Sequence, residues 1–186
     1  MKDAQGREIK YLRVSVTDRC NLRCKYCMPN GIECVEHKDI LSFEEIRQIA
    51  VCGARLGITK IRLTGGEPLA RKGCPELIRM LKEIPGIEKI AMTTNGTLVR
   101  AILPELVEAG LDEINISLDT LDARTFAAIT GQDLLPEVLL AIDAALAAGL
   151  KVKVNAVSMP DTDWKRLITL AKDKPVDVRF IELMPI

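Results

Sequence analysis

The sequence predicts an α/β fold organised around a parallel β-sheet, closed or open. Two observations support this prediction: short β-rich runs alternate with longer segments of helical periodicity, and helix-capping residues stand where those segments begin and end. Strand–helix repetition of this kind is typical of a parallel sheet, because each helix returns the chain to the start of the next strand. The 186 residues are enough for one domain with a substantial apolar core.

The individual elements follow in order from these patterns. Strands are predicted over residues 11–17, 60–64, 89–94, 113–118, 151–157 and 176–181, and helices over residues 43–56, 75–84, 101–109, 136–148 and 163–172. Ser42 before Phe43-Glu44-Glu45 predicts a capping box for the first helix. Gly57, Gly110 and Gly149 each stand just past a predicted helix end, where glycine is common.

Composition and cysteine usage argue against several classes of protein. The 26 basic side chains balance the 26 acidic ones, so charge gives no sign of a nucleic-acid partner. No apolar run approaches the roughly 20 residues that a membrane span needs. The polar N-terminus lacks the apolar stretch of a signal peptide. Six cysteines without an export signal favour metal binding in a reducing cytoplasm over disulfide bonds.

The sequence ends at Met184-Pro185-Ile186, directly after the sixth predicted strand and without a helix to cover it. A parallel strand that is bare on one face exposes apolar surface and an unpaired edge. We therefore expect an incomplete chain, in which residues 1–186 form one domain and a C-terminal region is missing. The alternative is a genuinely short protein that covers this edge by forming a homodimer.

Alternation along the strands places basic side chains on one face of the sheet. If helices cover the outside of a barrel, the polar side of each strand points into its interior. The basic side chains expected to converge there are Arg13, Arg62, Lys153 and Arg179. Since buried cations need partners and acids are few on these faces, an anionic ligand with phosphates or carboxylates is the preferred explanation. Alternatively, some basic residues pair with acids at the strand starts, as we expect for Lys60 and Lys151.

Three cysteines lie close together after the first predicted strand, in the segment Cys20-Asn21-Leu22-Arg23-Cys24-Lys25-Tyr26-Cys27. Three cysteinates on one loop can ligate three irons of a 4Fe–4S cubane and leave the fourth iron free to bind a small molecule. Cys34, Cys52 and Cys74 share no such spacing. Cys52 is expected to be a buried small apolar residue of the first helix.

A glycine motif, Thr64-Gly65-Gly66-Glu67-Pro68, follows the second predicted strand. Two glycines let a backbone approach a ligand closely, and the C-terminal edge of a parallel sheet is where barrel enzymes bind substrates. Glu67 can be interpreted as catalytic, but a glutamate before proline in a tight turn is better interpreted as a structural brace. Asp119 and Asp122, at a strand-to-helix turn, are expected to be helix caps and not an acid–base pair.

The spacing Cys-x3-Cys-x2-Cys with an aromatic residue before the last cysteine, followed by Gly-Gly-Glu-Pro, resembles the radical S-adenosylmethionine (radical SAM) superfamily. The resemblance covers essentially the whole chain and implies a partial (β/α)6 TIM-like barrel of the radical SAM type. Within this superfamily the chain is similar to the GTP 3′,8-cyclase (MoaA) family of molybdenum cofactor biosynthesis. The stretches that carry this similarity are residues 12–21, 26–29, 61–63, 93–96, 116–122, 129–131 and 179–185.

The resemblance implies roles for individual residues. Cys20, Cys24 and Cys27 would ligate a 4Fe–4S cluster, whose fourth iron would bind the amino and carboxylate groups of S-adenosylmethionine. The residues implied for S-adenosylmethionine are Tyr26, through its backbone, and Gly66, Ser117 and Met184. The residues implied for GTP are Arg13, Arg62, Thr93, Lys153 and Arg179. Strand alternation independently places the four basic residues of this set in the interior.

The implied activity is a lyase reaction on GTP. Reductive cleavage of S-adenosylmethionine would give a 5′-deoxyadenosyl radical that abstracts hydrogen from the ribose C3′ of GTP, and the carbon radical would attack C8 of guanine. The product would be (8S)-3′,8-cyclo-7,8-dihydroguanosine 5′-triphosphate, and a reductant protein such as a flavodoxin or ferredoxin would supply the electron. The family also holds a second cluster in a C-terminal region that this sequence lacks. The sequence therefore does not predict full cyclisation by this chain alone.

Other classes of protein share parts of this pattern. The three cysteines and His37 could form a Cys3His zinc site, but zinc explains neither the glycine motif nor the interior cations. His37 is instead expected to be a solvated loop residue. An electron-transfer module would need four cysteines for each cubane and no cation-lined cavity. Radical SAM enzymes that modify peptides or activate other enzymes share both motifs, and product analysis would separate them from a GTP cyclase.

Overall fold

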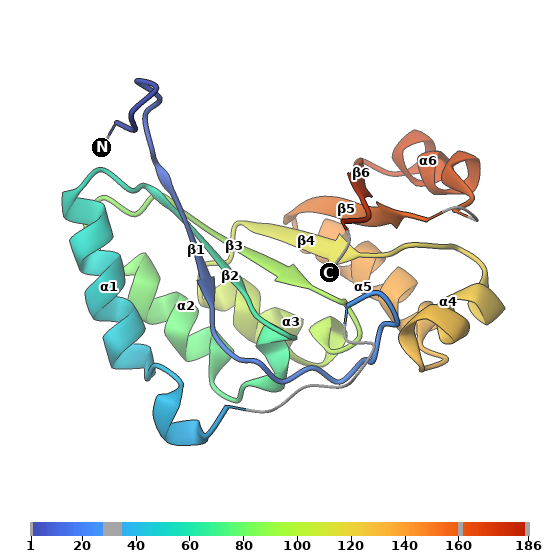
Figure 1. The fold of residues 1–186 in the computed structure, drawn as a ribbon, viewed down its shortest axis with the longest axis horizontal. Helices are drawn as coiled ribbons and strands as arrows, with labels where there is room; N and C mark the ends of the chain where they lie inside the picture. The colour runs from blue at the N-terminus through green and yellow to red at the C-terminus, as the bar shows by residue number, and fades with distance from the viewer. Residues whose placement is uncertain (1, 28–34, 160–161, 185–186) are drawn as a thin grey trace.

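A six-stranded, fully parallel β-sheet forms the centre of the molecule (Figure 1). The computed structural model describes residues 2–27, 35–159 and 162–184. The strands are β1 (Tyr11–Ser15), β2 (Lys60–Thr64), β3 (Lys89–Thr94), β4 (Glu113–Ser117), β5 (Lys151–Ser158) and β6 (Asp177–Glu182). They are hydrogen-bonded in sequence order, so β1 and β6 are the edges of an open sheet. The predicted parallel α/β sheet is confirmed in its open form.

Helices connect the strands and cover one face of the sheet. They are α1 (Phe43–Arg55), α2 (Cys74–Lys82), α3 (Val99–Glu108), α4 (Ala123–Thr130), α5 (Leu135–Ala147) and α6 (Trp164–Asp173), with short 3-10 helices η1 (His37–Asp39) and η2 (Pro68–Ala70). Figure 1 shows α1, α2, α3 and α5 along the same side of the sheet. The predicted capping box is confirmed, because Ser42 Oγ accepts from Glu45 N and the Glu45 carboxylate accepts from Ser42 N.

The apolar core lies between the sheet and these helices. The inner strands supply side chains that are at most 2% exposed, namely Ile61, Leu63, Ile90, Met92, Ile114, Ile116, Val152 and Val154. The helices supply Leu77, Ile78, Leu81, Leu106, Val138 and Ile142, all of which are also buried. Full burial of such a side chain contributes roughly 1.5–3 kcal/mol. Because the apolar side chains take the helix face, the polar side chains of the same strands are left on the opposite face.

Three local predictions are wrong. The sequence patterns do not predict α4. Asp122 is confirmed as the N-cap of this helix, because its carboxylate accepts from Thr125 N at 2.8 Å. Asp119 caps no helix, because its carboxylate accepts from Tyr26 Oη and Val157 N. Cys52 is exposed, since the buried face of α1 runs through Ile46 and Ala50. Two residues beyond Ala50, Cys52 lies about 200° around the helix.

Strand β6 and the residue that follows it carry exposed apolar side chains. Phe180, Ile181 and Leu183 are 40%, 46% and 41% exposed. This confirms the expectation that the sixth strand is incompletely covered.

Within the described ranges, no helix by itself has the length and apolar composition to cross a membrane, and only the sharply bent pair α4 and α5 meets both criteria when its two members are taken together.

Candidate active site

The cysteine segment leaves the C-terminal end of β1 and is held against the loop that follows β2. Val16 N donates to Thr64 O, Gly66 N donates to Thr17 O, and Glu67 N donates to Arg19 O, each at 2.8 Å. These backbone bonds extend the β1–β2 pairing beyond the sheet. The first cysteine therefore follows a segment whose position is set by the glycine motif.

The two glycines are required by this close contact. A Cβ on Gly65 would lie 2.4 Å from Thr17 O, and a Cβ on Gly66 would lie 2.4 Å from Arg19 O. Gly65 also has φ +155°, which side-chain-bearing residues rarely adopt. The predicted close backbone approach is confirmed, with the cysteine segment as the approaching chain. Contact of Gly66 with a ligand stays a prediction.

Glu67 is a structural brace, as predicted. Its side chain is fully buried and accepts from Leu69 N at 3.0 Å, Thr94 Oγ1 at 2.8 Å and Asn95 N at 2.7 Å. Burial raises the pKa of this carboxyl, although the three hydrogen bonds oppose the shift. Glu67 thereby joins the glycine loop to the end of β3. Each described hydrogen bond to its carboxylate comes from a protein donor.

The cysteine loop is also attached to α4 and to the residues after β3. Arg23 N donates to Thr130 O at 2.9 Å and Lys25 N donates to Ile129 O at 3.0 Å. The side-chain amide of Asn95 donates to Asn21 Oδ1 at 2.8 Å and lies 3.9 Å from Cys20 Sγ. The motif 129–131 therefore serves to dock the loop.

The three predicted cluster ligands share this loop and carry free thiols. Cys20 and Cys24 are half-buried and Cys27 is exposed. Burial raises the pKa of Cys24 to about 12, and Asp119 and the other two thiols add to the effect; burial and Cys20 raise the pKa of Cys27. Three thiols on one loop, near enough to influence one another's pKa, fit a 4Fe–4S cluster in donor type and number. No group of three His, Cys, Asp or Glu side chains in the described ranges forms a ready-made site for a single metal ion.

The zinc alternative has no further support. Cys34 and the side chain of His37 lie outside the described part of the chain, while Cys74 is buried and Cys52 is exposed on α1. Ligation by Cys20, Cys24 and Cys27 stays a prediction.

A cavity of about 530 Å³ lies on the polar face of the sheet. Its lining residues are Tyr11, Arg13, Lys60, Arg62, Asn115, Lys153, Asn155, Arg179, Phe180 and Ile181. Strands β1, β2, β5 and β6 each contribute a basic side chain. The predicted convergence of Arg13, Arg62, Lys153 and Arg179 on one cavity is confirmed.

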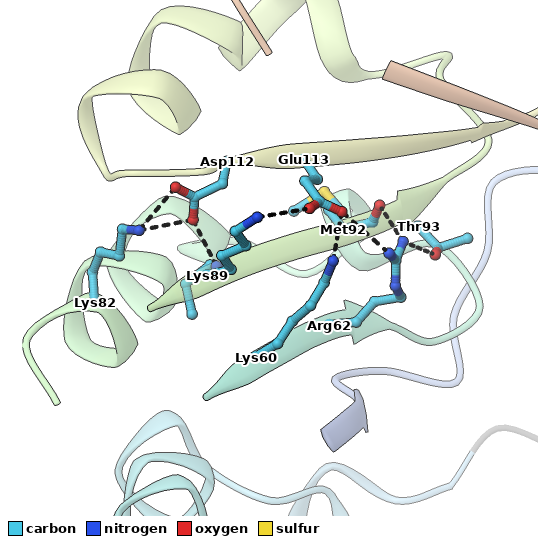
Figure 2. A network of polar contacts seen from close by, with 9 residues as sticks. Lys60, Arg62, Lys82, Lys89, Met92, Thr93, Asp112 and Glu113 are labelled. Atoms are coloured by element: carbon cyan, nitrogen blue, oxygen red, sulfur yellow. Dashed lines mark hydrogen bonds and ion pairs between the residues drawn. The ribbon is translucent and has the colours of Figure 1, made fainter. Parts of the chain in front are cut away.

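Glu113 is a buried acid whose contacts include Lys60 and Arg62, two of the basic residues of this cavity (Figure 2). Lys60 Nζ donates to its Oε2 at 2.6 Å, Arg62 Nη2 lies 3.9 Å from the same oxygen, and Lys89 Nζ lies 3.9 Å from Oε1. Burial acts to raise the pKa of Glu113, but the hydrogen bond and charge of Lys60, with help from Lys153 and Lys89, lower it overall. The predicted pairing of Lys60 is confirmed. Lys151 is exposed and has no ion pair within the described ranges, so its predicted pairing is wrong.

The cavity has more positive than negative charge. Arg62 is 6% exposed and donates to Thr93 Oγ1 at 3.2 Å and to Met92 O at 3.4 Å. Burial lowers the pKa of Lys153, and the nearby guanidinium of Arg179 lowers it further. Within the described residues, neither Lys153 nor Arg179 forms an ion pair. This excess of cations favours an anionic ligand.

A second cavity of about 190 Å³ adjoins the first. The two share the lining residues Arg13, Asn115, Asn155 and Ile181. The second is also lined by Tyr26, Thr93, Ser117 and Asp119, so it connects the cysteine loop to the cation-lined cavity. Met184 is 74% exposed and lines neither cavity, and Gly66 lines neither.

Two cavity residues, Asp119 and Asn115, received no role in the site from sequence reasoning. Asp119 continues the alternation of Glu113, Asn115 and Ser117, which is the signal that points it to the polar face. Asn115 is 5% exposed, lines both cavities, and its Oδ1 has no hydrogen-bond partner in the described part of the protein.

Comparison with known proteins agrees with this geometry. The chain is 49% identical over 191 residues to a GTP 3′,8-cyclase of Alkaliphilus oremlandii, with 100% of this chain and 60% of that protein covered. It is 50% identical over 192 residues to a GTP 3′,8-cyclase of Thermodesulfovibrio yellowstonii, with the same coverage. The chain thus spans about 60% of the length of these curated relatives.

Solved structures show the same fold at low sequence identity. Streptococcus suis SuiB bound to S-adenosylmethionine matches with a TM-score of 0.81 and 19% identity, over 95% of this chain and 41% of that one. Methylornithine synthase (PylB) matches with a TM-score of 0.77 and 19% identity, over 94% of this chain and 53% of that one. These matches confirm the predicted partial barrel. Residues 14–173 match the family model of the radical SAM superfamily, so the chain belongs to this superfamily, which uses a 4Fe–4S cluster and S-adenosylmethionine.

Proposed function

We propose that this chain is the catalytic core of a GTP 3′,8-cyclase of molybdenum cofactor biosynthesis. Residues 1–186 would form one radical SAM core domain. GTP would place its triphosphate in the 530 Å³ cavity, and S-adenosylmethionine would occupy the 190 Å³ cavity beside the cysteine loop. The similarity to relatives named GTP 3′,8-cyclase, of which the chain spans about 60%, supports this assignment.

The observation that carries the proposal is the continuity between the cation-lined cavity and the cysteine loop. Arg13 lines both cavities, and Tyr26, which stands between two of the predicted cluster ligands, lines the smaller one. A polyanion bound by the cations would therefore leave the rest of the same molecule next to the loop. This arrangement suits a nucleoside triphosphate that reacts at its sugar.

The electrostatics of the strands favour such a substrate. Arg13 and Arg62 are direct neighbours in the register of β1 and β2. Like charges placed opposite each other in a sheet are destabilising without a counter-charge. Arginine and phosphate form strong charge-assisted hydrogen bonds, so a triphosphate would relieve this repulsion.

The roles of the residues follow from these positions. Cys20, Cys24 and Cys27 would hold the cluster, and Tyr26 and Ser117, which line the smaller cavity, would contact S-adenosylmethionine. Gly66 and Met184, which line neither cavity, would contact the part of the cofactor that extends beyond it. When bound, the cluster and S-adenosylmethionine supply the radical chemistry. The chain itself would orient GTP through Arg13, Arg62, Thr93, Lys153 and Arg179 and exclude water from the reacting sugar. Arg62 already holds Thr93 in place through its hydrogen bond.

We also propose an acidic electron-transfer protein, such as a flavodoxin or ferredoxin, as the reductant, and the cytoplasm as the location. Arg19, Arg71 and Lys72 line a hollow of about 420 Å³ beside the cysteine segment, which suits an acidic partner. The described cysteines carry free thiols, which a reducing compartment would maintain.

Anaerobic reconstitution tests the cluster and its cofactor. The protein should take up about four irons per chain. With dithionite it should release 5′-deoxyadenosine from S-adenosylmethionine, measured by chromatography with and without GTP. Zinc uptake without cleavage would overturn the proposal.

Binding measurements test the substrate. Arg13→Ala and Arg62→Ala should weaken GTP binding, because both remove a cation from the cavity, whereas Arg100→Ala, in an exposed pair with Glu137, should leave it unchanged. Unchanged GTP affinity in both cavity variants, or a modified peptide as the product, would contradict the nucleotide assignment.

A further inference from the structure

The cysteine loop is attached to the protein unevenly. The residues just before it are held by the backbone carbonyls of Thr17 and Arg19, and its middle is held by the backbone N–H groups of Arg23 and Lys25. The backbone N–H of Cys27 bonds only within the loop, to Cys24 O at 3.0 Å. Within the described part of the chain, the Cys27 end of the loop is hydrogen-bonded to the rest of the protein through the side chain of Tyr26.

Asp119 is the partner of Tyr26. The phenol donates to Asp119 Oδ2 at 2.7 Å, and Val157 N in β5 donates to Asp119 Oδ1 at 2.8 Å. Asp119 lies two residues beyond the end of β4 and is 7% exposed. Its two oxygens therefore connect three parts of the structure, namely the cysteine loop, the end of β4 and the end of β5.

This carboxylate is costly to bury. Within the described ranges it forms no ion pair, and burial raises its pKa in spite of the two hydrogen bonds. Burying a charge without a counter-charge is unfavourable, and the two hydrogen bonds to this carboxylate offset part of that cost. Asp122, three residues later, already provides the cap of α4, so Asp119 is not needed for that purpose.

We propose that Asp119 is a positioning residue that fixes the Cys27 end of the cluster loop, and with it the cofactor cavity, through the phenol of Tyr26. The inference rests on the proposed function only in taking this loop as the cluster site. Tyr26 and Asp119 both line the 190 Å³ cavity and neither lines the 530 Å³ cavity. Loss of the contact should therefore affect the cluster and S-adenosylmethionine, and leave binding at the cations unchanged.

The test compares three variants after anaerobic reconstitution. Tyr26→Phe removes only the hydroxyl, Asp119→Ala removes the acceptor, and Asp119→Asn keeps one acceptor oxygen and offers an amide donor. The readouts are iron per chain, the rate of iron loss to a chelator, and the change in the electron paramagnetic resonance signal of the reduced cluster on titration with S-adenosylmethionine. Tyr26→Phe and Asp119→Ala should raise the concentration for the half-maximal signal change by about tenfold, the typical effect of one hydrogen bond to a charged group. Asp119→Asn should recover part of this loss.

Asp122→Ala is the matched control, because it removes a helix cap in the same segment without touching Tyr26. It should lower thermal stability and leave the titration with S-adenosylmethionine unchanged. The inference is overturned if Tyr26→Phe titrates and retains iron like the unmodified protein, or if Asp122→Ala shifts the titration as much as Asp119→Ala. If Asp119→Ala does not fold, the iron retention and the S-adenosylmethionine titration of Tyr26→Phe are sufficient to decide the inference. Failure of the unmodified protein to bind GTP, with a normal titration, would refute the proposed substrate and leave this inference standing.

Discussion

Replacing Glu113 by glutamine should lower the free energy of unfolding of the ligand-free protein and raise its affinity for a polyanion. The buried carboxylate hydrogen-bonds Lys60 at 2.6 Å and lies 3.9 Å from both Arg62 and Lys89. Without its charge, the basic residues on the polar face repel one another with no compensating anion. A bound triphosphate would then be the remaining source of negative charge in the cavity.

The expected loss of stability follows from these contacts. A hydrogen bond to a charged group contributes about 1.5–3 kcal/mol. Glutamine keeps the shape and one acceptor oxygen, and Lys89 is more than half exposed, so only part of this energy is lost. We therefore expect the free energy of unfolding at neutral pH to fall by about 1–2 kcal/mol, which is the charged part of the interaction.

Urea titrations across the acid range provide the assay. The cations hold the pKa of Glu113 below its ordinary value of 4.5, so its stabilising charge is fully present above that pH and is lost as the pH falls through the lowered pKa. Glutamine has no such proton, so the difference between the two proteins should shrink in the same range. Glu137→Gln, which breaks an exposed pair with Arg100, should change stability by less than about 1 kcal/mol. Equal stability of Glu113→Gln and the unmodified protein at neutral pH, with no gain in GTP affinity, would refute the reasoning.

Three further predictions concern the loops and the cysteines. Gly66→Ala should lower iron uptake, because the added Cβ would lie 2.4 Å from a backbone oxygen of the cysteine segment. Gly53→Ala in α1, whose added Cβ would meet its nearest atom at an ordinary 3.5 Å, should keep full uptake. Glu67→Ala leaves two buried donors and one half-buried donor unpaired, and it should lower the free energy of unfolding by about 3–5 kcal/mol in urea titration. A loss below about 1 kcal/mol would contradict its role as a brace. Cys52→Ser should retain its iron, since this thiol is exposed on α1, and Cys24→Ser should lose most of it; the reverse result would reassign the ligands.

Most of the sheet was predictable because strand and helix periodicity are local properties. The ranges 60–64 and 89–94 coincide with β2 and β3, and the polar side of each strand follows from simple alternation. This is why the convergence of the cavity cations could be predicted without a structure. Helix α4 was missed because its 8 residues are too few for a clear apolar period, although Asp122 and Gly131 mark its two ends.

The pairing of the charges could not be predicted in the same way. Lys60 in β2 reaches across β3 to Glu113 in β4, so its partner depends on strand order and register and not on local sequence. The position of Cys52 was misjudged from composition, although its spacing from Ala50 places it on the outer face of α1. Asp119 was interpreted as a cap because the sequence does not reveal that Tyr26 folds back onto it.

The basic side chains of the cavity also bear on how the chain selects its fold. A shift of one residue in the pairing of β1, β2, β5 or β6 would turn Arg13, Arg62, Lys153 or Arg179 toward the aliphatic layer beneath the helices. Ionised groups in such a layer are strongly disfavoured, so mispaired arrangements are penalised at the same positions that would recognise a ligand. Apolar replacements there would remove that penalty and make alternative strand pairings easier to form, even where they increased the stability of the native arrangement.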